Sequence, residues 1–549
     1  MSGDESGTSR CFRPFGVLNG TKGLGANMKK IIHFFLNGKL KEIEIKAETT
    51  VLELLRNNFE LNGIKEGCGE GDCGACTVVI GEVRAGKIHY KAVAGCLYLA
   101  AKLEGRHLIT IEGMAENDKL HPIQEAILNA HATQCGFCTP GVSLSILALY
   151  LEKSNPTKAE FQRYLEGNLC RCTGYASIRK VPDYLAELSI AAENIRLGYL
   201  AETEAKQLSF DSEDIFIDDG NNAYYSPVSE EHLEAFLDSH QELIKEKNFC
   251  YLNGGSDVVV GIKKRNQHYR LLLDLSRIAT LQMICYYNGK DIAENNTLET
   301  KNHENRDRNN NRTKISTFAN NEQEAKILII GGGVSLSRII DETTSVFPEF
   351  AAVVQKMCSE QVRSSATVAG NIVNASPVAD TVPLLMVVEA RITLKGLEGE
   401  RNVALRDFFH GYKKTENKET EWISFITIPL GDGDFINFEK VSKRKEVDIS
   451  AVNSAIALKV EKGIIIKAHI ACGGVGETTL YMPKTSRHLE GKEMKEVTFL
   501  GAFEVISTEA TPIGDVRSSA EYRQAMMQNL LMKHYLAYQK SQEATLYEK

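Results

Sequence analysis

The sequence predicts an α+β multidomain protein. At roughly 150 residues per domain, its 549 residues suggest about three to four domains. Apolar runs typical of strands alternate with segments that have the 3,4 spacing of amphipathic helices. Eight of the thirteen cysteines lie between Cys68 and Cys172, at short and irregular spacings. These observations indicate several small modules, of which the first two are rich in cysteine.

The first module is predicted at residues 29–115, after a Gly-, Ser- and charge-rich extension (1–28) that we expect to be disordered. Two β-like runs meet at Asn37-Gly38, which is a strong hairpin signal. A short helix is expected over residues 50–59, with Thr49 or Thr50 as its N-cap. The runs TVVIGEV and IHYKAV then predict later strands. This order of hairpin, helix and strands suggests a β-grasp-like module.

The second module is predicted at residues 116–200 and is helical. Its four segments with a helical period are IQEAILNAHA, TPGVSLSILALYLEK, KAEFQRYLEG and VPDYLAELSIAAENI. The connections between these segments carry four further cysteines. Residues 201–222 are acidic and polar, and we expect them to be a linker.

Residues 223–418 combine strand-like and helical runs, as an α+β nucleotide-binding domain would. They are interrupted by residues 288–321, a stretch with ten Asn that we interpret as a polar surface loop or disordered insert. The last region, residues 419–549, contains the strand-like runs WISFITIPL and GIIIKAHIAC. It ends in a long helical pattern.

Composition excludes several classes of protein. The 64 basic and 72 acidic residues give a net charge of −8, which argues against a nucleic-acid partner. No signal peptide or membrane-spanning run is visible in the sequence, so we expect a cytoplasmic protein without a membrane partner. In a reducing compartment, grouped cysteines are metal ligands or catalytic thiols more often than disulfides.

The first cysteine group has the spacing C-x4-C-x2-C-x19-C within GCGEGDCGACT. Its members are Cys68, Cys73, Cys76 and Cys96. C-x4-C-x2-C is the spacing of plant-type [2Fe–2S] ferredoxins. The glycines supply positive φ angles and exposed N–H donors for an anionic cluster. Zinc is the competing metal, although zinc ribbons favour two separated C-x2-C pairs.

The second group has the spacing C-x2-C-x31-C-x1-C, within QCGFCTPG and NLCRCTGY. Its members are Cys135, Cys138, Cys170 and Cys172. A C-x-C pair is cramped for a disulfide but can present two thiolates to a metal centre. The spacing favours an iron–sulfur cluster and leaves zinc open.

The two cysteine groups in this order, with QCGFCTPG and CRCTGY, resemble the iron–sulfur/FAD subunit of xanthine dehydrogenases in the molybdenum hydroxylase family. The resemblance implies a β-grasp ferredoxin domain, a helical-bundle [2Fe–2S] domain, a PCMH-type FAD domain and a C-terminal CO dehydrogenase flavoprotein-type domain. The first cysteine group would then hold the cluster nearer the flavin, and the second the cluster nearer the molybdenum cofactor. Gln134 would face the pterin; without the resemblance it is a solvated or capping amide.

Three further stretches resemble the family's flavin segments: YLNGGSD (251–257), QVRSSATVAGNIVNASPVADTVPLL (361–385) and FEKVSKRKEVDISAV (438–452). In YLNGGSD a strand runs into a double glycine, whose N–H groups can face a diphosphate, although such a pair is often only a turn. Ala369 stands where many relatives have glycine. For Lys440 the alternative is a charged edge strand, and for Met357 an ordinary core residue. The implied flavin contacts are Leu252, Asn253, Gly254, Gly255, Ser256, Asp257, Met357, Thr367, Gly370, Asn371, Asp380 and Lys440.

The resemblance implies an electron-transfer subunit with no catalytic residue of its own. Its cofactors would be two [2Fe–2S] clusters and FAD, with NAD as the electron acceptor. The molybdopterin cofactor would lie on a separate large subunit, in a heterodimer or a dimer of heterodimers, since this chain is too short for that domain. The alternatives are a subunit that serves aldehydes, nicotinate or another heteroaromatic, and a standalone iron–sulfur/flavin redox module.

Overall fold

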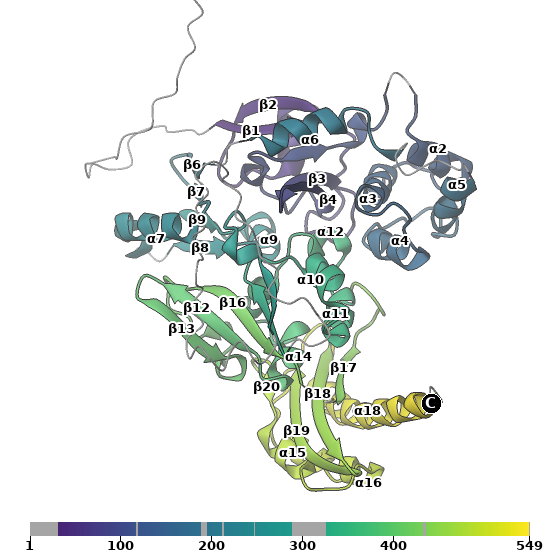
Figure 1. Ribbon diagram of the computed structural model, residues 1–549, viewed down its shortest axis with the longest axis vertical. Helices are drawn as coiled ribbons and strands as arrows, with labels where there is room; N and C mark the ends of the chain where they lie inside the picture. Colours follow the sequence, from purple (N-terminus) through teal and green to yellow (C-terminus); the bar gives the residue numbers. More distant parts are fainter. Residues whose placement is uncertain are drawn as a thin grey trace, which may run out of the picture.

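The computed structural model describes residues 31–116, 119–187, 195–210, 213–245, 248–287, 326–431 and 435–547. The N-terminal extension and the Asn-rich insert lie outside the described residues. Figure 1 shows an elongated arrangement, with the N-terminal sheet and helices at one end and the C-terminal sheet with its long helix at the other.

The first module is a five-stranded sheet in the order β2-β1-β5-β3-β4, in which β1 and β5 are parallel. Its strands are β1 (Ile31–Leu36), β2 (Lys39–Glu44), β3 (Thr77–Arg84), β4 (Lys87–Ala94) and β5 (His107–Ile109). At the predicted hairpin, Asn37 and Gly38 have φ of 49° and 82°, as a type I′ turn requires. Thr50 caps α1 (Val51–Glu53) through a capping box with Glu53, and a π-helical turn (Leu54–Asn58) comes next. The β-grasp prediction is confirmed.

The second module contains the four predicted helices and lies beside the first module (Figure 1). The helices are α2 (Pro122–Asn129), α3 (Thr139–Glu152), α4 (Lys158–Leu165) and α5 (Val181–Glu187). Buried residues of α3 share one apolar core with Val79 of β3 and Ala92 of β4. His121 caps α2, because its Nδ1 accepts a hydrogen bond from the N–H of Ile123 at 3.3 Å.

The segment expected as a linker is instead structured at both ends. Helix α6 (Leu200–Leu208) buries Leu200, Thr203 and Gln207. The Gln207 Nε2 donates to the carbonyl of Gly81 in β3 at 2.8 Å. Strand β6 (Ile215–Asp218) then begins the third module. The expectation missed α6 because its buried face is largely polar.

The third module contains two larger sheets and a two-stranded hairpin of β14 (Phe409–Gly411) and β15 (Lys414–Thr415). A four-stranded sheet has the order β6-β7-β9-β8 and a five-stranded sheet the order β10-β11-β16-β12-β13. Their strands after β6 are β7 (Ala223–Ser226), β8 (Phe249–Leu252), β9 (Leu271–Asp274), β10 (Ile284–Tyr287), β11 (Ile327–Gly331), β12 (Arg391–Gly396), β13 (Gly399–Ala404) and β16 (Trp422–Pro429). The helices are α7 (Glu230–Ser239), α8 (Gln241–Lys245), α9 (Ser256–Arg265), α10 (Leu336–Thr343), α11 (Pro348–Gln355), α12 (Glu360–Arg363), α13 (Val368–Val373) and α14 (Thr381–Val387).

The strand WISFITIPL was expected in the C-terminal region, but it is β16, which pairs with β11 and β12 inside the five-stranded sheet. Non-local pairing decides this placement, because β16 pairs on both sides and joins β10-β11 and β12-β13 into one sheet. We therefore propose that the third module extends to Pro429.

The fourth module is an antiparallel sheet in the order β17-β18-β19-β20, covered by four helices. Its elements are β17 (Phe435–Val441), β18 (Val452–Glu461), β19 (Ile464–Gly473), β20 (Leu480–Tyr481), α15 (Pro483–Leu489), α16 (Glu496–Leu500), α17 (Phe503–Ser507) and α18 (Ala520–Tyr547). The predicted long terminal helix is α18, which buries Met527, Leu530 and Leu531 against this sheet.

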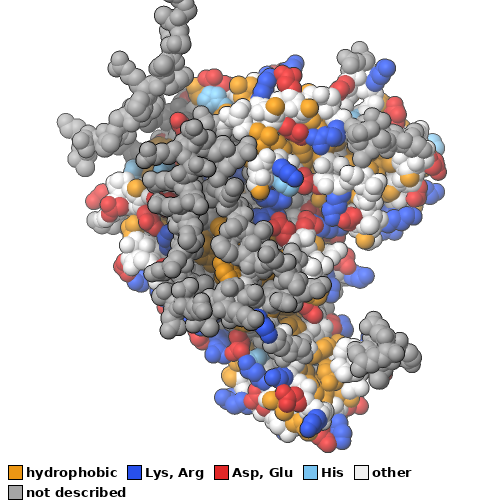
Figure 2. All heavy atoms as spheres, viewed as in Figure 1, with side chains coloured by type: hydrophobic (Ala, Val, Ile, Leu, Met, Phe, Trp, Pro, Cys, Tyr) orange, Lys and Arg blue, Asp and Glu red, His pale blue; other side chains and the backbone are white. Residues whose placement is uncertain are grey.

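The surface carries mixed charge, and both signs are interspersed over the face in Figure 2. No helix among the described residues is long and apolar enough to cross a membrane. Inside the molecule, Leu252 and Val259 of the third module share a buried apolar cluster with Phe34 and Leu97 of the first. The first cysteine module and the third module are therefore packed together through apolar side chains.

Candidate functional site

The first cysteine group lies in the loop that precedes β3, together with Cys96 just after β4. Gly69, Gly71 and Gly74 of this loop have φ of 69°, 86° and 63°. A Cβ on Gly74 would lie 2.5 Å from the carbonyl oxygen of Gly167. The loop therefore needs glycine both for its backbone angles and for its close contact with the second module.

The four thiols of the first cysteine group form two pairs. Cys68 lies within hydrogen-bond contact of Cys73, and Cys76 of Cys96. The N–H groups of Glu70 and Asp72 point at Cys68 Sγ, at 3.4 and 3.3 Å. The Cys73 thiol and these backbone donors favour the thiolate and lower the pKa of Cys68 to about 5, although burial opposes the shift.

The second cysteine group is paired in the same way. Cys135 Sγ and Cys172 Sγ are 3.5 Å apart, and Cys138 lies within hydrogen-bond contact of Cys170. Cys170 is buried and accepts from the Thr173 hydroxyl or donates to it at 3.1 Å. Cys135 and Cys172 are exposed.

Two pairs of thiols in each group fit a binuclear cluster, in which each iron takes two thiolates. A tetrahedral zinc site would instead bring four ligands to one point. Every described cysteine is a free thiol, so all eight are available as metal ligands. The residues present therefore fit two [2Fe–2S] clusters.

The two cysteine loops touch each other. The N–H of Leu169, which directly precedes Cys170, donates to the carbonyl of Cys73 at 3.0 Å. Asn168 Nδ2 donates to the Gly74 carbonyl at 3.2 Å. A Cβ on Gly141 would lie 2.2 Å from that same carbonyl, so glycine allows α3 to approach. The backbone hydrogen bond between Leu169 and Cys73 thus joins the loops of the two cysteine groups.

Apolar, polar and thiol side chains form an exposed patch at the second cysteine group. Phe137 and Leu169 are 46% and 48% exposed, and they flank the exposed Cys135 and Cys172. Gln134 is also exposed beside Cys135, as both interpretations of this residue require. Exposed apolar groups next to a redox site are typical of a partner-binding surface.

The first flavin segment is the loop between β8 and α9. Gly255 precedes α9 with φ of 73°, and a Cβ on Gly254 would lie 2.2 Å from the carbonyl oxygen of Ser365. Among the described residues, the N–H groups of Gly254, Gly255 and Ser256 have no acceptor. They stand at the N-terminus of a ten-residue helix, where an anion is stabilised.

The second flavin segment packs against this loop. Thr367 caps α13, and its Oγ accepts from the N–H of Gly370 at 3.0 Å. Asn371 Oδ1 accepts from the Thr381 hydroxyl at 2.6 Å. Ala369, which stands where many relatives have glycine, fits without a clash. Even a Cβ added to the neighbouring Gly332 would lie 3.5 Å from the Ala369 methyl, which is an ordinary contact distance.

Gly332 and Gly333 contact the first flavin segment, although the sequence alone did not assign them to the candidate site. The Asn253 Nδ2 donates to the Gly332 carbonyl at 3.4 Å. A Cβ on Gly333 would lie 3.1 Å from Asn253 Nδ2. The signal was present, because an apolar strand runs directly into a glycine triplet, as another strand does at Gly254.

Asp380 and Lys440, both predicted as flavin contacts, form a buried ion pair with each other. Lys440 Nζ lies 2.6 Å from Asp380 Oδ2, and the two side chains are 5% and 8% exposed. Asn453 Nδ2 donates to the same carboxylate at 2.7 Å. Lys440 also approaches the carbonyl of Lys356, the neighbour of the half-buried Met357, at 3.4 Å. Although β17 is an edge strand, this lysine is not a solvated surface charge.

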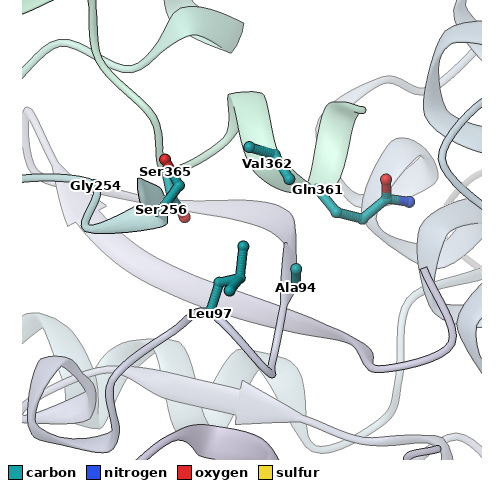
Figure 3. A pocket seen from close by; sticks show the side chains of 7 residues that line it. All are labelled: Ala94, Leu97, Gly254, Ser256, Gln361, Val362 and Ser365. Carbon is teal, nitrogen blue, oxygen red and sulfur yellow. The ribbon is translucent and has the colours of Figure 1, made fainter. Parts of the chain in front are cut away.

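A small cavity separates the first cysteine module from the flavin segments (Figure 3). Leu97 and Ala94 line it on one side, and Gly254, Ser256, Gln361, Val362 and Ser365 on the other. Its volume is about 10 Å³, room for about one water molecule and far below the roughly 300–1,000 Å³ of ordinary ligand pockets. The first cysteine module and the flavin segments are therefore in close contact across this cavity.

Four family models match consecutive parts of the chain. They are a 2Fe-2S iron-sulfur cluster binding domain at residues 34–97 and a [2Fe-2S] binding domain at 110–181. An FAD binding domain in molybdopterin dehydrogenase comes next at 300–431, and a CO dehydrogenase flavoprotein C-terminal domain at 438–538. These matches include all eight predicted cysteine ligands, the second flavin segment and Lys440, but not the loop 252–257.

The chain is 28% identical over 577 residues to xanthine dehydrogenase of Blastobotrys adeninivorans. The alignment covers 93% of this chain and 41% of that protein. The chain is thus similar to the molybdenum hydroxylase family over nearly its whole length. Another member of this family, aldehyde oxidase 1 of Bos taurus, is 27% identical over 541 residues, covering 92% and 39% of the two chains.

A solved carbon monoxide dehydrogenase of Hydrogenophaga pseudoflava is 22% identical, with a TM-score of 0.47, over 56% of this chain and 94% of that chain. The chain spans about two fifths of the length of the first molybdenum hydroxylases that it matches. The activities for which those relatives are named belong to the whole proteins.

Proposed function

We propose that this chain is the electron-transfer subunit of a molybdenum-dependent purine hydroxylase of the xanthine dehydrogenase type. It would pass electrons from a molybdopterin-bearing partner through two [2Fe–2S] clusters to FAD and on to NAD. The hydrogen bond from the Leu169 N–H to the Cys73 carbonyl carries the proposal, because it joins the two cysteine loops inside one chain.

The flavin supplies the exchange between single electrons and the two-electron hydride of a nicotinamide. The residues of this chain would bind and orient it. The N–H groups of Gly254, Gly255 and Ser256 would face the diphosphate. The Asp380–Lys440 pair would place one carboxylate and one ammonium beside the ring system in a site with little access to water. Leu97 would exclude water between that ring system and Cys96.

The partner would dock on the patch formed by Gln134, Phe137, Leu169 and Cys172. We propose that the molybdopterin cofactor lies on another polypeptide, which binds this exposed patch in a heterodimer or a dimer of heterodimers. The apolar Phe137 and Leu169 side chains would be covered in that complex.

A second candidate is the same role for a different substrate. The match to aldehyde oxidase 1 is nearly as extensive as the match to xanthine dehydrogenase, so aldehydes and heteroaromatics compete with purines as the substrate class. The substrate pocket would lie on the partner. Comparing xanthine with an aldehyde as substrate for the assembled enzyme decides between them.

Iron content tests the clusters directly. Anaerobically reconstituted protein is expected to contain about four irons per chain, since each cluster of this type holds two. Electron paramagnetic resonance (EPR) of the reduced protein should show two distinct [2Fe–2S] signals, because one cysteine group is partly exposed and the other is largely enclosed. Zinc bound in place of iron would refute the assignment.

The division of labour between subunits gives another prediction. The purified chain loaded with iron and FAD should reduce an artificial dye with NADH, yet it should not oxidise xanthine until the partner is added. Dye reduction and xanthine turnover are measured spectrophotometrically in the same preparation. Xanthine turnover by the chain alone would contradict the proposal, and a partnerless, inactive protein would favour the standalone redox module.

A further inference from the structure

A buried lysine of the first module reaches into the third module. Lys102 lies in the 3₁₀ turn Ala100–Leu103, and its side chain is 3% exposed. Its Nζ is 2.9 Å from Oδ2 of Asp274, a residue at the end of β9 with 0% exposure. A buried acid and a buried base are tolerated only when each is paired and hydrogen bonded, so this pair fixes the two modules against each other.

The lysine has two further acceptors. Its Nζ donates to the Ser276 hydroxyl at 3.3 Å and to the backbone carbonyl of Asn253. An ammonium has three N–H donors, and these three acceptors use all of them. Lys102 therefore cannot act as a direct ligand of an anion, but it holds one peptide group of the first flavin segment.

The contact with the Asn253 carbonyl also fixes the direction of the next N–H group. In a planar trans peptide the C=O and the next N–H point in opposite directions, so the Lys102 contact turns the Gly254 N–H away from the ammonium. Gly254, Gly255 and Ser256 then present N–H groups without an acceptor among the described residues, at the start of α9. On the other side, the Asn253 side chain is tied to Gly332.

We propose that Lys102 is a positioning residue for the flavin diphosphate. It keeps the Asn253 carbonyl turned away from the site, so that the neighbouring N–H groups remain aimed at phosphate oxygens. FAD affinity thereby depends on a residue of the first iron–sulfur module. This inference rests on the proposed function, since it assumes that the chain binds FAD.

The test is Lys102→Met in the full chain, with FAD and riboflavin titrated separately by flavin fluorescence. A hydrogen bond to a charged group is lost at the loop, so the FAD dissociation constant should rise by about tenfold. Riboflavin lacks the diphosphate, and its dissociation constant should not change. Iron content and both EPR signals should also be retained, because Lys102 contacts neither cysteine group.

A matched control lies in the same network. The Tyr224 hydroxyl donates to Asp274 Oδ2 at 2.5 Å, so Tyr224→Phe weakens the network without touching the contacts of Lys102 Nζ. It should bind FAD as the unmodified chain does. If Lys102→Met does not fold, Asp274→Asn replaces it, because this change removes the charge that anchors the ammonium, and it should also weaken FAD binding selectively.

Wild-type FAD affinity in Lys102→Met, or in Asp274→Asn where that variant replaces it, would overturn the inference. Equal losses for FAD and riboflavin would overturn it too, since they would indicate general damage to the site. These outcomes leave the proposed function standing. Failure of the unmodified, iron-loaded chain to bind FAD would refute the proposed function itself, and the inference with it.

Discussion

Glu360→Gln is expected to lower the free energy of unfolding by about 3 kcal/mol, because it leaves two buried arginines with less counter-charge. Glu360 is 2% exposed, and its Oε2 accepts from Arg163 Nε at 2.8 Å and from Arg363 at 3.3 Å. The Ser337 hydroxyl donates to its Oε1 at 2.7 Å. Arg163 belongs to α4 of the second module, so the loss should loosen that module from the third. The midpoint of urea-induced unfolding measures this loss of stability.

Asp341→Asn is the matched control, because Asp341 binds the same Arg163 at 2.8 Å but is 39% exposed. An exposed partner contributes less than about 1 kcal/mol, so this variant should unfold near the wild-type midpoint. If both variants unfold at the same denaturant concentration, the buried network does not hold the modules together.

The same carboxylate gives a pH dependence with a defined sign. Burial raises the pKa of Glu360, but the charges of Arg163 and Arg363 outweigh it and hold the pKa below its ordinary value of 4.5. The unfolded chain therefore binds a proton more readily than the native protein does. The contribution of Glu360 is fully present above about pH 4.5 and is lost as the pH falls through the native pKa. The difference between wild type and Glu360→Gln should shrink in acid.

Local signals in the sequence predicted much of the fold. The Asn37-Gly38 turn needs two positive φ angles, and few other residue pairs provide them. Thr50 and Glu53 satisfy each other's backbone groups within four residues, so this helix start is readable from the sequence. The cysteine spacing likewise reflects a loop that would surround a single [2Fe–2S] cluster. Each of these constraints acts over a few residues.

Contacts between distant residues were not predictable in this way. The Lys102–Asp274 and Arg163–Glu360 pairs join different modules, and no local period marks them. Asp274 did carry one signal, since an acid inside the apolar run LLLDLS needs a buried partner, but the sequence does not say which base supplies it. The position of β16 between β11 and β12 has the same origin, because strand order is set by pairing across the sheet.

Cys170→Ser is expected to abolish one [2Fe–2S] EPR signal and to reduce partner-driven flavin reduction to background. Cys170 is buried, paired with Cys138 and directly bonded to Leu169, whose N–H reaches the Cys73 carbonyl. Serine oxygen is a harder and less acidic ligand than a thiolate, so the second cluster should not assemble. The first cluster should persist, because Cys76 and Cys96 belong to a different buried core from Cys170. Iron should fall from about four to about two per chain.

Dye reduction by NADH distinguishes a lost relay from a lost fold. It needs only the flavin and its own loops, so Cys170→Ser should retain it while partner-driven reduction disappears. Cys250→Ser serves as the control, since Cys250 is a half-buried thiol in β8 outside both cysteine groups, and it should keep both EPR signals. Loss of both signals in Cys170→Ser would mean that the Leu169–Cys73 contact couples the folding of the two cysteine loops, so that neither cluster forms without the other.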